Sequence, residues 1–409
     1  MPRIGIATVL ILAMLATGCS REHAPARADS ALHSWPGEDW VISSLEAEGL
    51  NAAPIERFVA DLRSGDYGLV NHFLLIRHGR VVVDEKFERD YESIAESVRP
   101  DEKIGINKHD PQYDYDNTDF HPYYDGTDMH SLQSVTKSIT SVALGIAVDA
   151  GFVEGTDVAV LPFFEAYKFD KSDPRKAAIS LQDLLTMQSG IDWNTEGGYQ
   201  DSTHSSVGLE SSNAWIQYVL DRPMDTKPGS VFEYNDGVAV LLGKIIRVAT
   251  GKRVDQWAEE HLFAPIGIDT YFWKITPDGE ADSMGGLYLS ASDLARIGYL
   301  FLRKGIWQDE RVVSEEWIRQ SITRHVADIE PESSEQITGY GYQWWLPEHE
   351  ADEPMSYLAI GFGGQRLAVI PEYDLVIVFN GWDIRGDYGR AERTFRREVL
   401  STAVIEPAL

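Results

Sequence analysis

The pattern of apolar and polar positions predicts strands near both ends of the chain and helices between them. Apolar runs at 73–77 and 80–87 flank His78-Gly79, which is typical of a β-hairpin. Residues 134–150 are apolar on nearly every side, which predicts a buried helix. The other predicted elements are strands at 340–345, 364–370 and 375–379 and helices at 54–62, 212–220, 237–248, 290–302, 314–321 and 390–404.

This order of elements indicates an α/β (α+β) fold. Strands contributed by both termini favour one antiparallel sheet flanked by helices, and the segment between them predicts an inserted helical lobe. A chain of 409 residues is long enough to bury a large core. We expect a functional site in the cleft between sheet and lobe.

The first residues are typical of a bacterial targeting segment. Arg3 supplies a positive charge, residues 4–15 are apolar, and small residues precede Cys19, the only cysteine. We therefore predict a lipoprotein-type signal at 1–19 with Cys19 lipidated, a flexible tether at 20–45 and a folded domain at 46–409. Ordinary signal cleavage stays an alternative, because Ala16 stands where lipoprotein signals more often have a larger aliphatic residue.

Composition and charge narrow the classes of partner. The hydrophobic fraction of 43% is that of a globular protein, and a net charge of −29 argues against nucleic acid and against an anionic membrane surface as partners of the folded body. We expect a protein of the bacterial cell envelope, on the periplasmic side, that contacts a membrane only through its N-terminal lipid. The N-terminal segment resembles bacterial lipoprotein signals, and this resemblance implies retention in the outer membrane more than in the inner one, because Ser20 and not Asp follows the lipid site. No pattern of metal ligands or of a cofactor site is present in the sequence, and nothing indicates the oligomeric state.

The most informative motif is Ser134-Val135-Thr136-Lys137, at the start of the buried helix. If Ser134 lies in the first turn, Lys137 follows one turn later on the same face, within reach of the hydroxyl. The helix N-terminus adds positive potential where an oxyanion would form. The motif alone is also compatible with a helix-capping serine and a solvated lysine.

Five further segments follow this motif in order. Together they resemble the serine β-lactamase and penicillin-binding-protein superfamily, and within it the class C-like esterases, D-amino-acid amidases and 6-aminohexanoate-oligomer hydrolases. The resemblance covers about residues 50–405 and implies a β-lactamase/transpeptidase-like fold. The six segments are Ser134–Lys137, Leu184–Gly190, Pro228–Asp236, Leu241–Gly243, Gly285–Leu287 and Gly361–Gln365.

The resemblance also implies roles for individual residues. Ser134 becomes the nucleophile, Lys137 its partner and Tyr234 the general acid and base, with Lys137 useful as a base only if burial leaves it partly deprotonated. The oxyanion would be bound by the N–H groups of Ser134 and Gly364, with Gly363 beside it. A core tyrosine at 234 and a plain glycine-rich turn before an edge strand are the alternatives.

Two departures from the family pattern bear on the substrate. Gly361 and Phe362 stand where a Lys or His and a Thr often bind a substrate carboxylate, and Asp236 replaces a commoner Asn. Both changes point away from β-lactams and towards amides or esters of a small-molecule or peptide-like substrate. We therefore expect a secreted serine hydrolase acting through a Ser134 acyl-enzyme. The alternative is a catalytically weak, penicillin-binding or sensor-like envelope protein.

Overall fold

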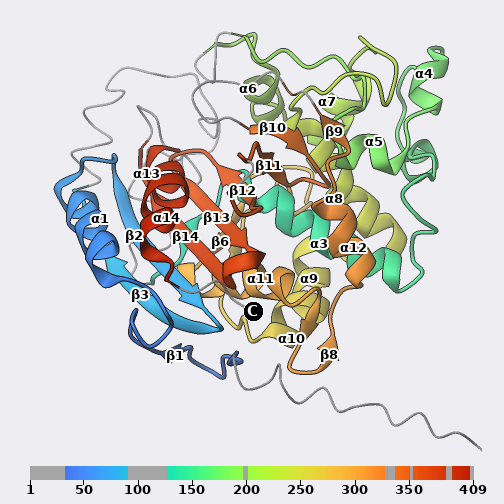
Figure 1. Ribbon diagram of the computed structural model, residues 1–409. Coiled ribbons are helices and arrows are strands. Elements are labelled where there is room, and N and C mark those ends of the chain that lie inside the picture. The colour runs from blue at the N-terminus through green and yellow to red at the C-terminus, as the bar shows by residue number, and fades with distance from the viewer. Residues whose placement is uncertain are drawn as a thin grey trace, which may run out of the picture.

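The computed structural model describes residues 33–90, 127–196, 201–327, 329, 337–350, 353–383 and 389–405. Its centre is a nine-stranded sheet in the order β1-β3-β2-β14-β13-β12-β11-β10-β9 (Figure 1). All neighbouring strands are antiparallel except β1, which pairs parallel with β3. The prediction of one sheet built from both ends of the chain is confirmed. The strands are β1 (Val41–Ile42), β2 (Val70–Arg77), β3 (Arg80–Lys86), β9 (Val326–Ala327), β10 (Ile337–Tyr340), β11 (Trp345–Pro347), β12 (Tyr357–Gly361), β13 (Gln365–Ile370) and β14 (Leu375–Gly381).

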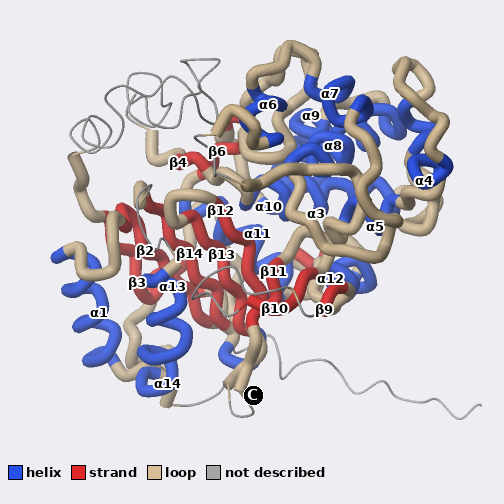
Figure 2. The backbone as a smooth tube through the Cα atoms, turned by 90° about the horizontal axis from the view of Figure 1, so that it is seen from above, coloured by secondary structure: helices blue, strands red, loops and turns tan. Residues whose placement is uncertain are grey.

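Helices cover both faces of this sheet because successive side chains of its central strands point to opposite sides. Phe73 and Leu75 of β2 pack with the helices of the chain termini, whereas Leu74 and Ile76 belong to the core on the other face. Figures 1 and 2 show α1, α13 and α14 on the first face and α11 on the second. These helices are α1 (Ala52–Ser64), α11 (Ala291–Leu302), α13 (Arg390–Thr394) and α14 (Leu400–Ala403), with a π-helical turn at Phe395–Val399.

A lobe of helices stands beside the sheet, as Figure 2 shows. Its centre is the contact between α3 (Val135–Asp149) and α8 (Asp236–Thr250), two long helices whose packing faces are apolar. None of the helices in the described part of the chain has both the length and the apolarity needed to cross a membrane. The other lobe elements are α4 (Pro174–Ala177), α5 (Leu181–Leu185), α6 (Ser205–Glu210), α7 (Trp215–Asp221), α9 (Val254–Ala258), α10 (Ala264–Ile266), α12 (Glu315–Ser321), β4 (His130–Ser131), β5 (Phe272–Trp273), β6 (Leu287–Leu289), β7 (Ile306–Trp307) and β8 (Glu310–Arg311).

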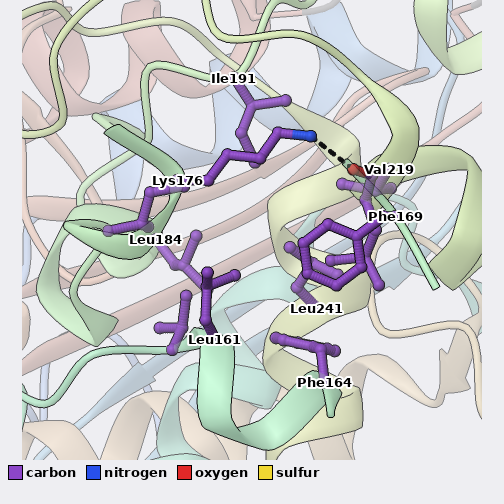
Figure 3. A pocket seen from close by; sticks show the side chains of 11 residues that line it. Leu161, Phe164, Phe169, Lys176, Leu184, Ile191, Val219 and Leu241 are labelled. Carbon is purple, nitrogen blue, oxygen red and sulfur yellow. Dashed lines mark hydrogen bonds between the residues drawn. The ribbon is translucent and has the colours of Figure 1, made fainter. Parts of the chain in front are cut away.

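Inside the lobe lies a small apolar cavity with one charged group, Lys176 (Figure 3). The cavity measures about 20 Å³, room for one water molecule. The Lys176 Nζ donates to the carbonyl of Leu220, in the last turn of α7, at 2.7 Å and lies 5.5 Å from the centre of the Phe169 ring. Burial lowers the pKa of this amine. Lys176 thus satisfies a carbonyl at a helix end within an apolar core, which is a structural role.

The structure changes the predicted domain boundary. From His33 onward the segment assigned to the tether is packed on the body, since Trp35 and Trp40 contact Tyr299 and Arg296 donates to the carbonyls of Gly37 and Glu38. The folded unit therefore begins at or before residue 33 rather than at residue 46. Cys19 and the predicted signal lie outside the described residues, so lipidation stays a prediction.

One predicted strand is wrong and another was missed. Residues 340–345 form the connection between β10 and β11, where Gln343 adopts a left-handed φ of 64° that a strand cannot contain. β12 follows shortly afterwards and carries the predicted Gly361 at its end.

Gly298 provides a test of how tightly α11 packs on the sheet. A Cβ at this position would lie 2.6 Å from Val376 and 2.7 Å from Leu367. In an exposed helix, Gly→Ala stabilises by up to about 1 kcal/mol, but overpacking a core costs about 1–3 kcal/mol. We predict that Gly298→Ala lowers the free energy of unfolding in urea by about 1–2 kcal/mol; a gain in stability would contradict this packing.

Candidate active site

Ser134 lies at the junction between β4 and α3. Gln133, directly before it, has a left-handed φ of 47°, so the chain turns sharply from strand into helix at this point. Ser134 is the N-cap residue of α3, but its side chain makes no capping hydrogen bond. The hydroxyl therefore does not cap the N-terminus of α3, so the alternative in which Ser134 is only a helix-capping serine does not hold.

Lys137 lies one turn into α3 and is almost completely buried. Its Nζ donates to Ser134 Oγ at 2.9 Å, to the Met284 carbonyl at 2.7 Å and to Asp236 Oδ1 at 2.7 Å. An ammonium group has three N–H donors, and these three acceptors share them with the hydroxyl of Tyr234, which also lies within reach. The spacing of the motif thus brings the two side chains together as predicted, and a buried carboxylate balances the charge.

Asp236 begins α8 and approaches Lys137 from the opposite side. Its second oxygen, Oδ2, accepts a hydrogen bond of 2.5 Å from the hydroxyl of Ser206. Ser206 is itself oriented, because its N–H donates to Nδ1 of His204 at 3.1 Å. No motif in the sequence pointed to His204 or Ser206. Ser206 lies 30 residues before Asp236, and only the fold brings the two together.

Tyr234 completes the group. Its hydroxyl lies within hydrogen-bonding reach of both Ser134 and Lys137. The ring is stacked on Trp345, with 5.4 Å between ring centroids and 28° between planes. The Tyr234 hydroxyl thus faces Ser134, and its ring packs on Trp345 of β11.

Burial and neighbouring charges determine the ionisation of Lys137, Asp236 and Tyr234. Burial alone would lower the pKa of Lys137, but the charge of Asp236 and the hydroxyl of Tyr234 outweigh it and raise the pKa above its usual value. Burial would raise the pKa of Asp236, and Lys137 lowers it overall. Burial and the charge of Asp236 raise the pKa of Tyr234. The resting site therefore contains an ammonium, a carboxylate and a phenol. The condition under which Lys137 could act as a base, partial deprotonation through burial, is not met.

The glycine segment forms the turn between β12 and β13, closed by the pair Gly361 and Gln365. A Cβ at Gly361 would lie 2.3 Å from the carbonyl oxygen of Leu132, so the turn touches the segment leading to Ser134. Gly363 and Gly364 have backbone φ angles of 80° and 100°, which residues with a side chain rarely adopt. Both strands lie inside the sheet, so the alternative of an edge strand is wrong, whereas the assignment of the Gly364 N–H as an oxyanion donor stays a prediction.

Two buried side chains hold this turn from behind. Gln365 Nε2 donates to the carbonyls of Phe362 at 3.2 Å and Gly381 at 2.7 Å. Arg366 donates to the carbonyl of Gly361 at 3.1 Å. Because a carbonyl and the following N–H belong to one planar peptide, the bonds to the carbonyls of Gly361 and Phe362 fix the directions of the N–H groups of Phe362 and Gly363.

Comparison with known proteins identifies the family of this chain. The family model described as Beta-lactamase matches residues 70–391. The chain belongs to the Beta-lactamase family. It is 28% identical to the 6-aminohexanoate-dimer hydrolase of Paenarthrobacter ureafaciens over 269 residues, which are 61% of this chain and 65% of that protein. The chain thus spans somewhat less than two thirds of this relative.

Solved structures show the same fold. A putative 6-aminohexanoate-dimer hydrolase from Bacillus anthracis has a TM-score of 0.62 at 16% identity, covering 91% of this chain and 89% of that one. A family VIII carboxylesterase has a TM-score of 0.60 at 14% identity, covering 89% and 98%. The predicted β-lactamase-like fold is confirmed.

The negative charge of Asp236 should influence how the reactivity of the site depends on pH. Asp236→Asn removes the negative charge that raises the pKa of both Tyr234 and Lys137, so more Tyr234 is ionised at a given pH. We predict that the rising limb of the pH profile for fluorophosphonate labelling of Ser134 moves to lower pH. Asp157→Asn, which removes the same charge from an exposed position, is the control and should leave the profile in place. A shift to higher pH would contradict the assigned electrostatics.

Proposed function

We propose that this protein is a serine hydrolase that cleaves an amide or ester bond through an acyl-enzyme on Ser134. The observation that carries the proposal is the position of Ser134 Oγ. It accepts from Lys137 Nζ at 2.9 Å, within reach of the Tyr234 hydroxyl, while Lys137 is held by Asp236. A serine hydroxyl needs such neighbours to become a useful nucleophile.

The charges of the site suggest how protons move. Lys137 is an ammonium at rest, so it orients Ser134 and stabilises negative charge instead of accepting the proton. Tyr234 accepts the proton of Ser134 in the fraction of molecules where its phenol is ionised, and then donates it to the leaving group. A water molecule, activated by Tyr234 in the same way, releases the acyl group. The oxyanion is bound by the N–H of Ser134 and one N–H of the turn at 361–364.

The substrate class follows from groups that the turn lacks. Gly361 and Phe362 offer neither a cation nor a hydroxyl to a substrate carboxylate, so a β-lactam finds no anchor there. The Paenarthrobacter relative is titled a hydrolase of an amide dimer and one structural relative a carboxylesterase. These names support amides and esters as the substrates of this chain too.

A second function has one observation in its favour. The pKa values of both Lys137 and Tyr234 are raised, so no base is already ionised at neutral pH. A slow or inactive site of this kind suits a penicillin-binding or sensor-like protein, and structural relatives include a penicillin-binding protein homologue from Caulobacter crescentus. Rapid turnover of a simple ester at neutral pH would exclude this alternative.

Substitution of the three central residues tests the hydrolase proposal. We predict that Ser134→Ala abolishes labelling by a fluorophosphonate and turnover of p-nitrophenyl acetate, with little change in melting temperature. Tyr234→Phe and Lys137→Ala should each lose at least about a hundredfold in kcat, and the double variant should lose little more because the groups act as one unit. Labelling of Ser134→Ala, or full kcat in Tyr234→Phe, would refute the assignment.

The substrate proposal has its own test. A panel of p-nitrophenyl esters, D-amino-acid amides, linear amide oligomers and nitrocefin should show kcat/KM for nitrocefin at least about tenfold below that for the best ester or amide, since roughly 1.4 kcal/mol of carboxylate binding is enough for this factor. Nitrocefin turnover equal to the best ester would mean that another group binds the carboxylate.

A further inference from the structure

The loop between β5 and β6 rests on the same face of α3 that carries Lys137. Thr140 Oγ1 donates to the Ser283 carbonyl at 3.2 Å, and Lys137 Nζ donates to the Met284 carbonyl at 2.7 Å. The N–H of Leu287 donates to Thr136 Oγ1 at 3.2 Å. Three side chains of α3 thus bind this loop, and one of them is the lysine of the active site.

Asp282, in the last part of the loop, is buried with its carboxylate turned onto the loop's own backbone. Its Oδ1 accepts from the N–H groups of Met284 and Gly285, each at 3.1 Å. The Asp282 backbone is also held, because its N–H donates to the Lys274 carbonyl at 2.8 Å and its carbonyl accepts from Trp273 Nε1 at 2.7 Å. The carboxylate is therefore a fixed acceptor.

The geometry of one peptide group connects Asp282 to Lys137. The carbonyl of Met284 and the N–H of Gly285 belong to the same planar trans peptide and point in opposite directions. Asp282 holds the N–H side, so the carbonyl side must face away from Asp282, where it meets Lys137 Nζ. The peptide is thus clamped between a buried carboxylate and a buried ammonium.

We propose that Asp282 is a positioning residue for the hydrolytic site: by fixing the Met284–Gly285 peptide it supplies Lys137 with a backbone acceptor and so holds the ammonium against Ser134. The inference rests on the proposed role of Lys137. Without this carbonyl, Lys137 keeps its side-chain partners Asp236, Ser134 and Tyr234 but loses the only backbone acceptor described for its Nζ. A displacement of about 1 Å at such a group can cost about a hundredfold in rate.

This role needs the oxygen of Asp282 and not its charge. Burial raises the pKa of the carboxyl, whereas Lys274 and the two N–H groups act in the opposite direction. Oδ1 accepts hydrogen bonds whether or not Oδ2 carries a proton, and the amide oxygen of Asn accepts in the same way. Asp282→Asn should therefore preserve the function that Asp282→Ala removes.

The experiment measures kcat and KM for p-nitrophenyl acetate and the rate of fluorophosphonate labelling, together with melting temperature. In Asp282→Ala we expect kcat and the labelling rate to fall about 10- to 100-fold with KM changed less than about threefold. Asp282→Asn should stay within about threefold of wild type. The matched control is Ser283→Ala, which removes the bond from Ser283 Oγ to the Ala239 carbonyl in the same loop but leaves the Met284 peptide clamped. Ser283→Ala should lower the melting temperature without the fall in kcat.

Each other outcome overturns the inference. Wild-type kcat in Asp282→Ala means that the clamp does not position Lys137. Equal losses in Asp282→Asn and Asp282→Ala mean that the charge acts, and an equal loss in Ser283→Ala means that any loosening of the loop suffices. If Asp282→Ala does not fold, Gly286→Ala replaces it, because a Cβ there would lie 2.9 Å from the Asp282 carboxyl carbon. A folded Gly286→Ala with wild-type kcat would count equally against the clamp.

Ser134→Ala in the same assays separates this inference from the proposed function. If the wild-type protein labels on Ser134 and the Asp282 variants behave like wild type, only the positioning role fails. If the wild-type protein neither labels nor turns over the ester, the hydrolase proposal fails before Asp282 is considered.

Discussion

The ion pair between Lys137 and Asp236 is the interaction on which the site depends. Both groups are withdrawn from water, and a buried ion pair must compensate the free energy of desolvation with close contact and further hydrogen bonds. Here the contact is 2.7 Å, and Ser134, Met284 and Ser206 provide the further bonds. Such a pair tolerates little rearrangement, because removing either partner leaves the other charge buried alone. The position of the Ser134 hydroxyl is thereby tied to the electrostatic balance of the core.

This balance also joins parts of the chain that are far apart. Lys137 comes from α3, Asp236 from the first turn of α8, and the Met284 carbonyl from the loop before β6. The glycine turn after β12 then touches the approach to Ser134 at Leu132. Four segments from both halves of the molecule therefore meet within a few side chains of one hydroxyl, and the arrangement of sheet and lobe fixes the geometry that the chemistry requires.

Much of this could be predicted from the sequence, because it depends on local pattern. The hairpin at His78-Gly79, the buried helix after Ser134 and the strands on either side of residues 371–374 follow from periodicity and turn residues. The connection at 340–345 could not be predicted, because its apolar side chains have strand character while Gln343 adopts a left-handed backbone. The charge of Lys137 could not be predicted either, since burial and a neighbouring carboxylate shift its pKa in opposite directions and only the distance decides between them. The contacts of Ser206 and Met284 could not be predicted from the sequence. Ser206 belongs to no motif, and Met284 contributes its backbone carbonyl, which every residue has.

The pairing of β14 with β2 has a consequence for how the molecule is made. Residues 375–381 lie between β13 and a strand formed by residues 70–77, so the centre of the sheet closes only when the last part of the chain is present. Pairings across about 300 residues carry a large loop-closure entropy and form slowly. Until then, the apolar faces of β2 and β3 lack their neighbour and are exposed to association with other chains. A newly made chain of this protein is therefore most vulnerable to aggregation in the interval before its C-terminal strands arrive, and a cell that produces it has reason to keep it bound to a chaperone during that time.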